Sequence, residues 1–251
     1  NIARFPFFCW YFYSQNFKPL FFDVTDYEAI LESTEIIKND LKKGESLAGL
    51  VNNAGIALGG PISMIDTKIF RKQFDVNFFG LIDVTKAYLP LLGARKESQN
   101  QGKIINISSI SGKRANPFVA PYSASKFALE AFSDSLRREL LIYGVDVILI
   151  EPGPIKTPIW NKVPDIDNNP FINTEYEIPL RKFTKGYLKI GENGFPPSVI
   201  GERVVKIMNT NTPKTRYVIT PNKMKNYLMP GFLPDRWVDN MIGKMLGIIK
   251  K

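Results

Sequence analysis

A tyrosine and a lysine stand four residues apart in the segment PYSASKFALEAF, at Tyr122 and Lys126. On a helix this spacing places both side chains on one face, one turn apart. Tyrosine has a pKa near ~10 and is a poor base at neutral pH, but a nearby ammonium group stabilises the phenolate and lowers that pKa. The pair therefore indicates a proton donor and acceptor, although such pairs also occur on many exposed helices.

A serine, Ser109, follows the strand-like run KIINIS and stands thirteen residues before Tyr122 (122 minus 109). Side chains at the carboxyl ends of parallel strands face the crevice in which α/β proteins bind ligands. A hydroxyl group at this place is suited to hold a substrate carbonyl oxygen. The alternative is a serine that only caps a turn.

Three more segments combine polar or turn residues with apolar neighbours. NNAG, Asn52 to Gly55, follows the apolar run LAGLV, and its glycine lets the chain pass close to a ligand or to another backbone segment. Asn77 interrupts an apolar helical pattern, where its amide can bond backbone or water and bend the helix. Pro152, Gly153 and Pro154 end the run VILIE, with Thr157 shortly after them. Ordinary turn chemistry is the alternative for the first and third segments.

The chain contains no histidine and one cysteine, Cys9. A Ser-His-Asp triad and a histidine-ligated zinc site are therefore excluded, and one cysteine cannot form a thiolate cluster. We expect no metal site, and any general base must be Asp, Glu, Lys, Tyr or the lone Cys9. The single cysteine is compatible with a reducing compartment, so a cytoplasmic location is expected.

The formal net charge of +9 raises the question of a nucleic-acid or anionic-membrane partner. The lysines and arginines are scattered in short clusters, such as Lys42–Lys43 and Arg137–Arg138, and form no long stripe. We therefore expect solvated surface charge and no nucleic-acid partner. Residues Phe5 to Tyr13 are apolar but fall far short of the ~20 residues of a membrane-spanning helix, which leaves weak membrane-surface association open.

From Pro19 onward, strand-like runs alternate with helical patterns, which favours a mostly parallel sheet covered by helices on both faces. The predicted strands are Pro19–Val24, Leu47–Asn53, Lys103–Ser108, Val145–Glu151 and Arg216–Thr220. The predicted helices are Tyr27–Lys43, Thr67–Leu92, Tyr122–Tyr143, Pro197–Asn209 and Pro234–Gly247. Asp26 is expected to cap the first helix and Gly144 to end the third. The stretch Pro154–Lys189 has weak helical periodicity and is interpreted either as a mobile insertion over a site or as a surface excursion.

Taken together, these motifs resemble those of the short-chain dehydrogenase/reductase family in order and spacing. The resemblance covers the chain from about Pro19 to its carboxyl end and implies a single-domain α/β fold with a Rossmann-like doubly wound parallel sheet. It implies an oxidoreductase that interconverts an alcohol and a ketone or aldehyde with NAD or NADP. The segments GKRANPFVAPYSASKFALEAFSDSLRREL and LPDRWVDNMIGKMLG resemble the branch of retinol and hydroxysteroid dehydrogenases, which implies a lipophilic substrate and a pocket drawn from the apolar residues between Ile159 and Leu188.

The resemblance also implies roles for individual residues. Tyr122 is the general acid/base, Ser109 positions the substrate oxygen, Lys126 lowers the tyrosine pKa and binds the nicotinamide ribose, and Asn77 holds a water that relays protons. The residues implied in cofactor binding are Asp23, Val24, Asn53, Ala54, Gly55, Asn77, Tyr122, Lys126, Pro152, Gly153, Ile155 and Thr157. A homodimer or homotetramer through the two long helices is expected from the same resemblance.

The sequence departs from the family at its start. A complete member begins with a strand and a glycine-rich turn that receives the pyrophosphate, whereas the first glycine of this chain is Gly44. We therefore expect residues 1–18 to form an atypical aromatic segment, residues 19–251 to form the dehydrogenase domain with 154–189 as a substrate-side insertion, and the first β-α-β unit to be incomplete. A truncated or misread product and a shortened working variant are both open. The competing function is a catalytically silent remnant that acts only by binding a partner.

Overall fold

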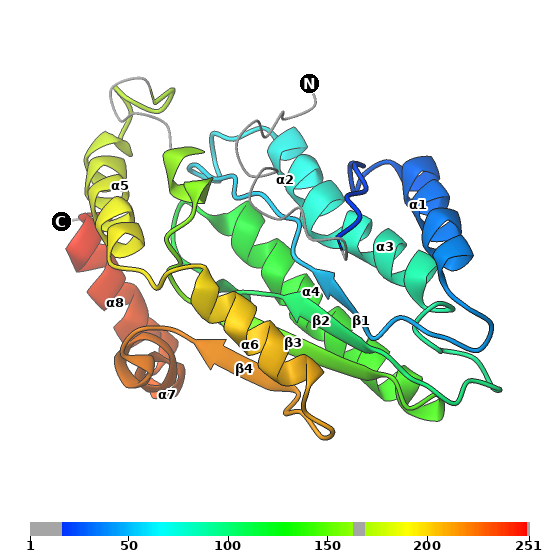
Figure 1. Cartoon of the computed structure of the whole chain (residues 1–251). Helices are drawn as coiled ribbons and strands as arrows, with labels where there is room; N and C mark the ends of the chain where they lie inside the picture. Colours follow the sequence, from blue (N-terminus) through cyan, green and yellow to red (C-terminus); the bar gives the residue numbers. More distant parts are fainter. Residues whose placement is uncertain (1–16, 163–168, 250–251) are drawn as a thin grey trace.

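A single parallel sheet forms the centre of the molecule in a computed structural model, which describes residues 17–162 and 169–249 (Figure 1). Its strands occur in the order β1-β2-β3-β4, with neighbours joined by parallel pairing. Their bounds are Gly49–Asn52 for β1, Lys103–Ile107 for β2, Asp146–Pro152 for β3 and Arg216–Ile219 for β4. This arrangement, with helices on both faces, confirms the predicted Rossmann-like α/β class.

The two central strands are buried because their apolar side chains point to both faces. On one face Ile104 joins Val147, its partner in the register, in an apolar cluster with the end of helix α4 (Ala120–Glu139). On the other face Ile105 and its partner Ile148 pack against helix α6 (Ser198–Met208). Runs without polar alternation are typical of strands covered on both sides.

Helices α2 (Thr67–Phe74) and α3 (Gly80–Tyr88) lie beside α4, and α1 (Tyr27–Asp40) packs on the outside of α3 (Figure 1). Between α2 and α3, residues Asp75–Phe79 form one π-helical turn, so the predicted helix Thr67–Leu92 has a local change of winding and ends at Tyr88. The other predicted helices are confirmed to within a few residues. Asp26 caps α1 by accepting a bond from the Ala29 N–H at 3.1 Å, as predicted.

Three helices complete the carboxyl-terminal part: α5 (Glu177–Glu192), α7 (Met229–Phe232) and α8 (Asp235–Leu246). The sequence did not predict α5, which occupies the end of the stretch read as weakly periodic. This helix is stabilised by distant partners, since Leu180 packs with Phe118 and Leu246 in one buried cluster. None of the described helices is long and apolar enough to cross a membrane.

The predicted strand Pro19–Val24 is wrong, because these residues form no strand and Phe21 is 86% exposed. A strand requires a hydrogen-bonded neighbour, and the outer edge of β1 pairs with no strand within the described ranges. The segment instead runs against α3, where the carbonyl oxygen of Val24 lies only 2.6 Å from the position that a Cβ on Gly80 would take. The other four predicted strands are confirmed: three have slightly shorter bounds, and β3 is shifted by one residue, from the predicted Val145–Glu151 to Asp146–Pro152.

Ile150 offers a test of the core because it is fully buried on β3. We expect Ile150→Ala to lower the free energy of unfolding by about 2–5 kcal/mol, the usual cost of removing a large buried aliphatic side chain. Leu141→Ala is the control, because Leu141 is 72% exposed and its loss should change stability by less than about 0.5 kcal/mol. Urea denaturation measures both, and equal losses would contradict the assigned core.

Candidate active site

Lys126 is a buried charged group at the carboxyl edge of the sheet. It lies in the second turn of α4, and its ammonium group donates to the carbonyl oxygen of Ile107, the last residue of β2, at 2.8 Å. Burial lowers the pKa of Lys126 to about 8, and the negative charge of Glu130, one turn further along α4, opposes this shift. An ammonium group is thus held at the end of the strand that leads to Ser109.

Tyr122 and Ser109 are brought together as the sequence predicted. The Ser109 hydroxyl interacts with the Tyr122 hydroxyl, which lowers the pKa of Tyr122, but burial is the larger cause and raises it. Lys126 is not among the causes that shift the pKa of Tyr122, so the expectation that its ammonium lowers this pKa stays a prediction. The Lys126 nitrogen lies 5.9 Å from the centre of the tyrosine ring and donates a hydrogen bond to the Ile107 carbonyl.

Asn77 lies in the π-helical turn and is fixed by three hydrogen bonds to residues outside this turn. Its side-chain oxygen accepts from the Ile56 N–H at 2.8 Å, and its amide nitrogen donates to the Ile56 carbonyl at 3.0 Å and to the Ser125 hydroxyl at 3.3 Å. The predicted bonding of Asn77 to backbone is therefore confirmed. Because Ser125 also donates to the Tyr122 carbonyl at 2.7 Å, Asn77 joins the loop after β1 to the turn that carries Tyr122.

Gln73 is a site residue that the sequence analysis missed. It is fully buried, accepts from the Leu58 N–H and donates to the Ile56 carbonyl, each at 2.8 Å. The available signal was its spacing of four from Asn77, which places both amides on one helix face. Together the two amides hold the loop that follows the NNAG segment.

Asn52 is the buried member of the NNAG segment. Its amide donates to Thr85 and to Asn106, each at 2.9 Å, which joins β1 to α3 and β2. Gly55 stands at the other end of the segment, and a Cβ there would lie 3.4 Å from the Asn77 side-chain oxygen. Asn53 and Ala54, the predicted cofactor contacts between them, are exposed.

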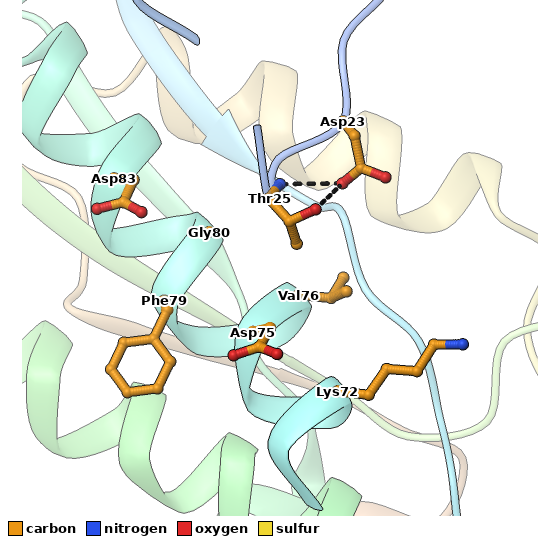
Figure 2. Close-up of a pocket in the computed structure, with 8 residues that line it drawn as sticks. All are labelled: Asp23, Thr25, Lys72, Asp75, Val76, Phe79, Gly80 and Asp83. Carbon is orange, nitrogen blue, oxygen red and sulfur yellow. Dashed lines mark hydrogen bonds between the residues drawn. The ribbon is translucent and has the colours of Figure 1, made fainter. Parts of the chain in front are cut away.

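Asp23 and Val24 lie away from the tyrosine, over the junction of α2 and α3. Asp23 accepts from both the N–H and the hydroxyl of Thr25, at 2.9 and 2.8 Å, and these bonds lower the pKa of its carboxyl group. Figure 2 shows the hollow that this turn forms with the helix surface. It has a volume of about 480 Å³ and is lined by Asp23, Thr25, Lys72, Asp75, Val76, Phe79, Gly80 and Asp83. Ser109, Tyr122 and Lys126 do not line it.

The segment after β3 runs beside Ser109, whose hydroxyl donates to the Pro152 carbonyl at 3.5 Å. Gly153 packs so closely that a Cβ would lie 2.3 Å from the Thr220 hydroxyl oxygen. Ile155 pairs with Phe195 in a parallel bridge and accepts from the Trp160 ring N–H at 2.6 Å. Thr157 follows in the same segment, so the structure places these predicted contacts along one path next to Ser109.

An aromatic cluster extends from this segment to α5. Tyr187 has its ring centre 4.6 Å from that of Trp160 and 5.2 Å from that of Phe183. Burial is the main cause that raises the pKa of Tyr187 to about 12, and the nearby Tyr122 contributes. Tyr187 therefore stands near the candidate acid/base, on a helix that the sequence did not predict but within the stretch Ile159–Leu188 expected to supply a pocket.

Comparison with known proteins now adds to this geometry. Residues 12–167 match the family described as short chain dehydrogenase. This chain belongs to the short-chain dehydrogenase family. It is 42% identical over 234 residues to an NADPH-dependent 3-dehydrocapnine reductase from Ornithobacterium rhinotracheale, which covers 93% of this chain and 82% of that protein. It is 35% identical over 240 residues to retinol dehydrogenase 7 of Rattus norvegicus, and this alignment covers 91% of this chain and 74% of that protein.

Solved structures agree on the fold. A short-chain dehydrogenase from Streptomyces avermitilis aligns with a TM-score of 0.65 at 23% identity, covering 90% of this chain and 78% of that one. A short chain dehydrogenase from Burkholderia cenocepacia in complex with NADP aligns with a TM-score of 0.65 at 23% identity, covering 89% of this chain and 80% of that one. The predicted fold and the predicted family of oxidoreductases are therefore confirmed.

The short-chain dehydrogenase has a buried charge network behind Lys126. Glu130 forms ion pairs with Lys113 at 3.0 Å and with the Nε of Arg216 at 3.1 Å. A carboxylate oxygen of Glu151 lies 3.3 Å from the same Nε. Burial raises the pKa of Glu151, whose other oxygen accepts from the Tyr227 hydroxyl at 2.7 Å. This network connects the face of α4 behind the site to β3 and β4.

The pKa of Lys126 predicts how stability changes with pH. Below about 8 the folded chain bears the full cost of a buried ammonium, and this cost is relieved as the pH rises from there towards the unfolded pKa of ~10.4. The unfolded chain binds more protons in this window, so the free energy of unfolding should rise with pH. Urea denaturation at a series of pH values measures the free energy of unfolding of the unaltered protein and of Lys126→Met. The unaltered protein should show the rise and the variant should not, and parallel profiles would contradict the assignment.

Glu130→Gln should lower the pKa of Lys126 further, because it removes the charge that opposes the effect of burial. Competitive acetylation followed by mass spectrometry measures this titration directly. Asp134→Asn is the matched control, since Asp134 also pairs with Arg216, at 2.9 Å, but is not among the causes that shift the Lys126 pKa. An unchanged lysine titration in folded Glu130→Gln, or equal shifts in both variants, would rule out this electrostatic role.

Proposed function

We propose that this chain interconverts an alcohol and a ketone or aldehyde with NAD or NADP, with Tyr122 as the general acid/base. The observation that carries the proposal is the juxtaposition of the Tyr122 and Ser109 hydroxyls with the buried ammonium of Lys126. Proton transfer to a reacting oxygen needs a donor held beside it and a charge that stabilises the donor once its proton has left. The three side chains meet both needs at the carboxyl edge of the sheet.

In the direction of reduction, the Tyr122 hydroxyl gives its proton to the carbonyl oxygen as that oxygen gains negative charge. Ser109 donates a hydrogen bond to the same oxygen and positions it. The Lys126 ammonium stabilises the tyrosinate that remains until solvent supplies a proton. Asn77 keeps the neighbouring loop in place through Ile56, and we assign it the support of a water that delivers this proton.

The donors present fit the nicotinamide end of a dinucleotide. An ammonium group has three N–H donors, and the bond to Ile107 requires one, so Lys126 can also bind ribose hydroxyls. NAD or NADP supplies the hydride acceptor or donor. We assign Pro152, Gly153, Ile155 and Thr157 to the nicotinamide end. The adenosine side is assigned to Asp23, Val24, Asn53, Ala54 and Gly55.

A lipophilic substrate is supported by an aromatic cluster whose member Tyr187 lies near Tyr122. Trp160, Tyr187 and Phe183 lie in consecutive ring contacts, within the described residues 154–162 and 169–189. We assign the stretch 154–189 to substrate binding. A retinol dehydrogenase is among the relatives, as is a reductase named for 3-dehydrocapnine. We infer that the substrate is an apolar molecule that carries a single ketone, aldehyde or alcohol group near one end.

Isothermal titration with NADPH and with NADH tests the proposal before any substrate is known. The proposal expects saturable binding of at least one cofactor and, with 3-dehydrocapnine or retinal, loss of NAD(P)H absorbance. Absence of cofactor binding by folded protein would instead support the catalytically silent alternative. A working enzyme and a silent remnant are therefore separated by one binding measurement and one assay.

Tyr122→Phe keeps the ring and removes the hydroxyl. Turnover should fall at least ~100-fold, the usual scale of general acid/base assistance, while cofactor affinity changes little. Spectrophotometry of NAD(P)H and titration of the cofactor measure the two effects. Tyr143→Phe, a tyrosine in the turn that follows α4, is the matched control. Retained turnover in Tyr122→Phe would exclude the proposed role.

Tyr187→Ala should raise the KM for an apolar ketone at least several-fold, because it opens the aromatic cluster beside Tyr122. Steady-state kinetics with a long-chain and a short-chain ketone measure the effect, which should be larger for the long chain. Tyr27→Ala is the control, since Tyr27 is 51% exposed on α1. Equal effects on both substrates would contradict a role in recognising apolar substrates.

A further inference from the structure

The carboxyl-terminal helix α8 presents an apolar row to the outside of the molecule. Trp237, Met241 and Met245 are 68%, 56% and 66% exposed, and their spacing of four places them along one face. We call these three residues the apolar ridge. Leu246 lies on the opposite face, where it packs in the cluster with Leu180 and Phe118. The inner face therefore anchors α8 to α5, which lies beside it (Figure 1), and the ridge is exposed to solvent.

More exposed apolar side chains flank the ridge at both ends of α8. Phe232, just before the helix, is 86% exposed, and Ile248 and Ile249, just after it, are 42% and 43% exposed. Single exposed apolar residues are common on protein surfaces, but a helical row continued at both ends marks an interaction surface. The helix spans twelve residues, too few to cross a bilayer and long enough to lie along one.

The charges on α8 are arranged around this row. Lys244 stands seven residues after Trp237, on the same side two turns on, and Arg236 lies at its flank. Asp235 lies two residues before Trp237, and Asp239 lies two residues after it. At ~100° per residue, each aspartate is rotated about 200° around the helix axis from Trp237. Cations border the apolar row, and the acids lie on the far side of the helix.

We propose that α8 docks this chain on an anionic lipid surface, with the apolar ridge entering the headgroup boundary. Residues 221–251 contain six lysines and arginines and two aspartates, a net charge of +4 (six minus two). This charge favours an anionic membrane and opposes the pairing of two copies of the same surface. Tryptophan at a polar–apolar boundary and cations beside an apolar stripe are features of interfacial helices. The proposal does not depend on the proposed catalytic function.

Flotation of the full chain with vesicles tests the proposal. It should bind vesicles of phosphatidylcholine with phosphatidylserine, bind pure phosphatidylcholine less, and dissociate as salt rises. The triple variant Trp237→Asn/Met241→Gln/Met245→Gln should lose at least about tenfold in partitioning. The matched control is Leu141→Gln/Ile142→Gln/Val205→Gln, which removes side chains that are 72%, 77% and 60% exposed elsewhere. Equal loss in both triple variants would overturn the proposal.

A charge variant keeps the test independent of changes to the apolar side chains. Arg236→Ala/Lys244→Ala should weaken binding to the anionic vesicles, whereas Lys42→Ala/Lys43→Ala, an equal loss of charge at exposed residues near the end of α1, should not. Circular dichroism establishes that each variant is folded.

Two further results would contradict the proposal: one would assign lipid binding to another segment, and the other would assign the ridge to self-association. If deletion of Phe5–Tyr13 abolishes vesicle binding and the ridge variant does not, the amino-terminal segment is the anchor and the proposal fails. If sedimentation without lipid shows that the ridge variant changes only the oligomeric state, a second copy of the chain covers α8 and the proposal fails.

Discussion

The hydrogen bond from the Lys126 ammonium to the Ile107 carbonyl is the contact on which the arrangement of the candidate site depends. It joins the amino-terminal half of α4 to the end of β2, and thereby sets the distance between Tyr122 and Ser109. Because Tyr122 lies one turn before Lys126, any shift of the helix along the strand would separate the two hydroxyls. Ser125, the residue before Lys126, extends the same attachment to Asn77 and the loop after β1.

Burying this ammonium is costly, which explains why charge accumulates behind it. Glu130 lies one turn further along α4, where Arg216 and Lys113 compensate its own charge. One oxygen each of Glu130 and Glu151 lacks a hydrogen-bond partner among the described residues, so the network stabilises its charges mainly through ion pairs. The lysine's protonation is consequently linked to how β3 and β4 hold their acidic and basic side chains.

Local sequence patterns predicted those elements whose conformation depends on neighbouring residues in the chain. Apolar runs such as Ile104–Ile107 marked the buried strands, and the spacing of Tyr122 and Lys126 placed them on one helix face. Pro19–Val24 fails because a strand forms only with a hydrogen-bonded neighbour, which its own residues cannot supply. The helix α5 was missed because its stability comes from distant contacts such as Leu180 with Leu246. The direction of the Tyr122 pKa also depends on burial, which the spacing does not encode.

Helix α5 connects the two proposals physically. Leu180 near its start packs with Leu246 of α8, while Tyr187, seven residues on, approaches Tyr122. Phe183 lies between them, with its ring 5.5 Å from that of Phe118 and 5.2 Å from that of Tyr187. The apolar cluster that anchors α8 therefore continues as an aromatic row to the candidate acid/base. If α8 docks on a lipid membrane, the aromatic side of the site lies close to the membrane, in which an apolar substrate dissolves.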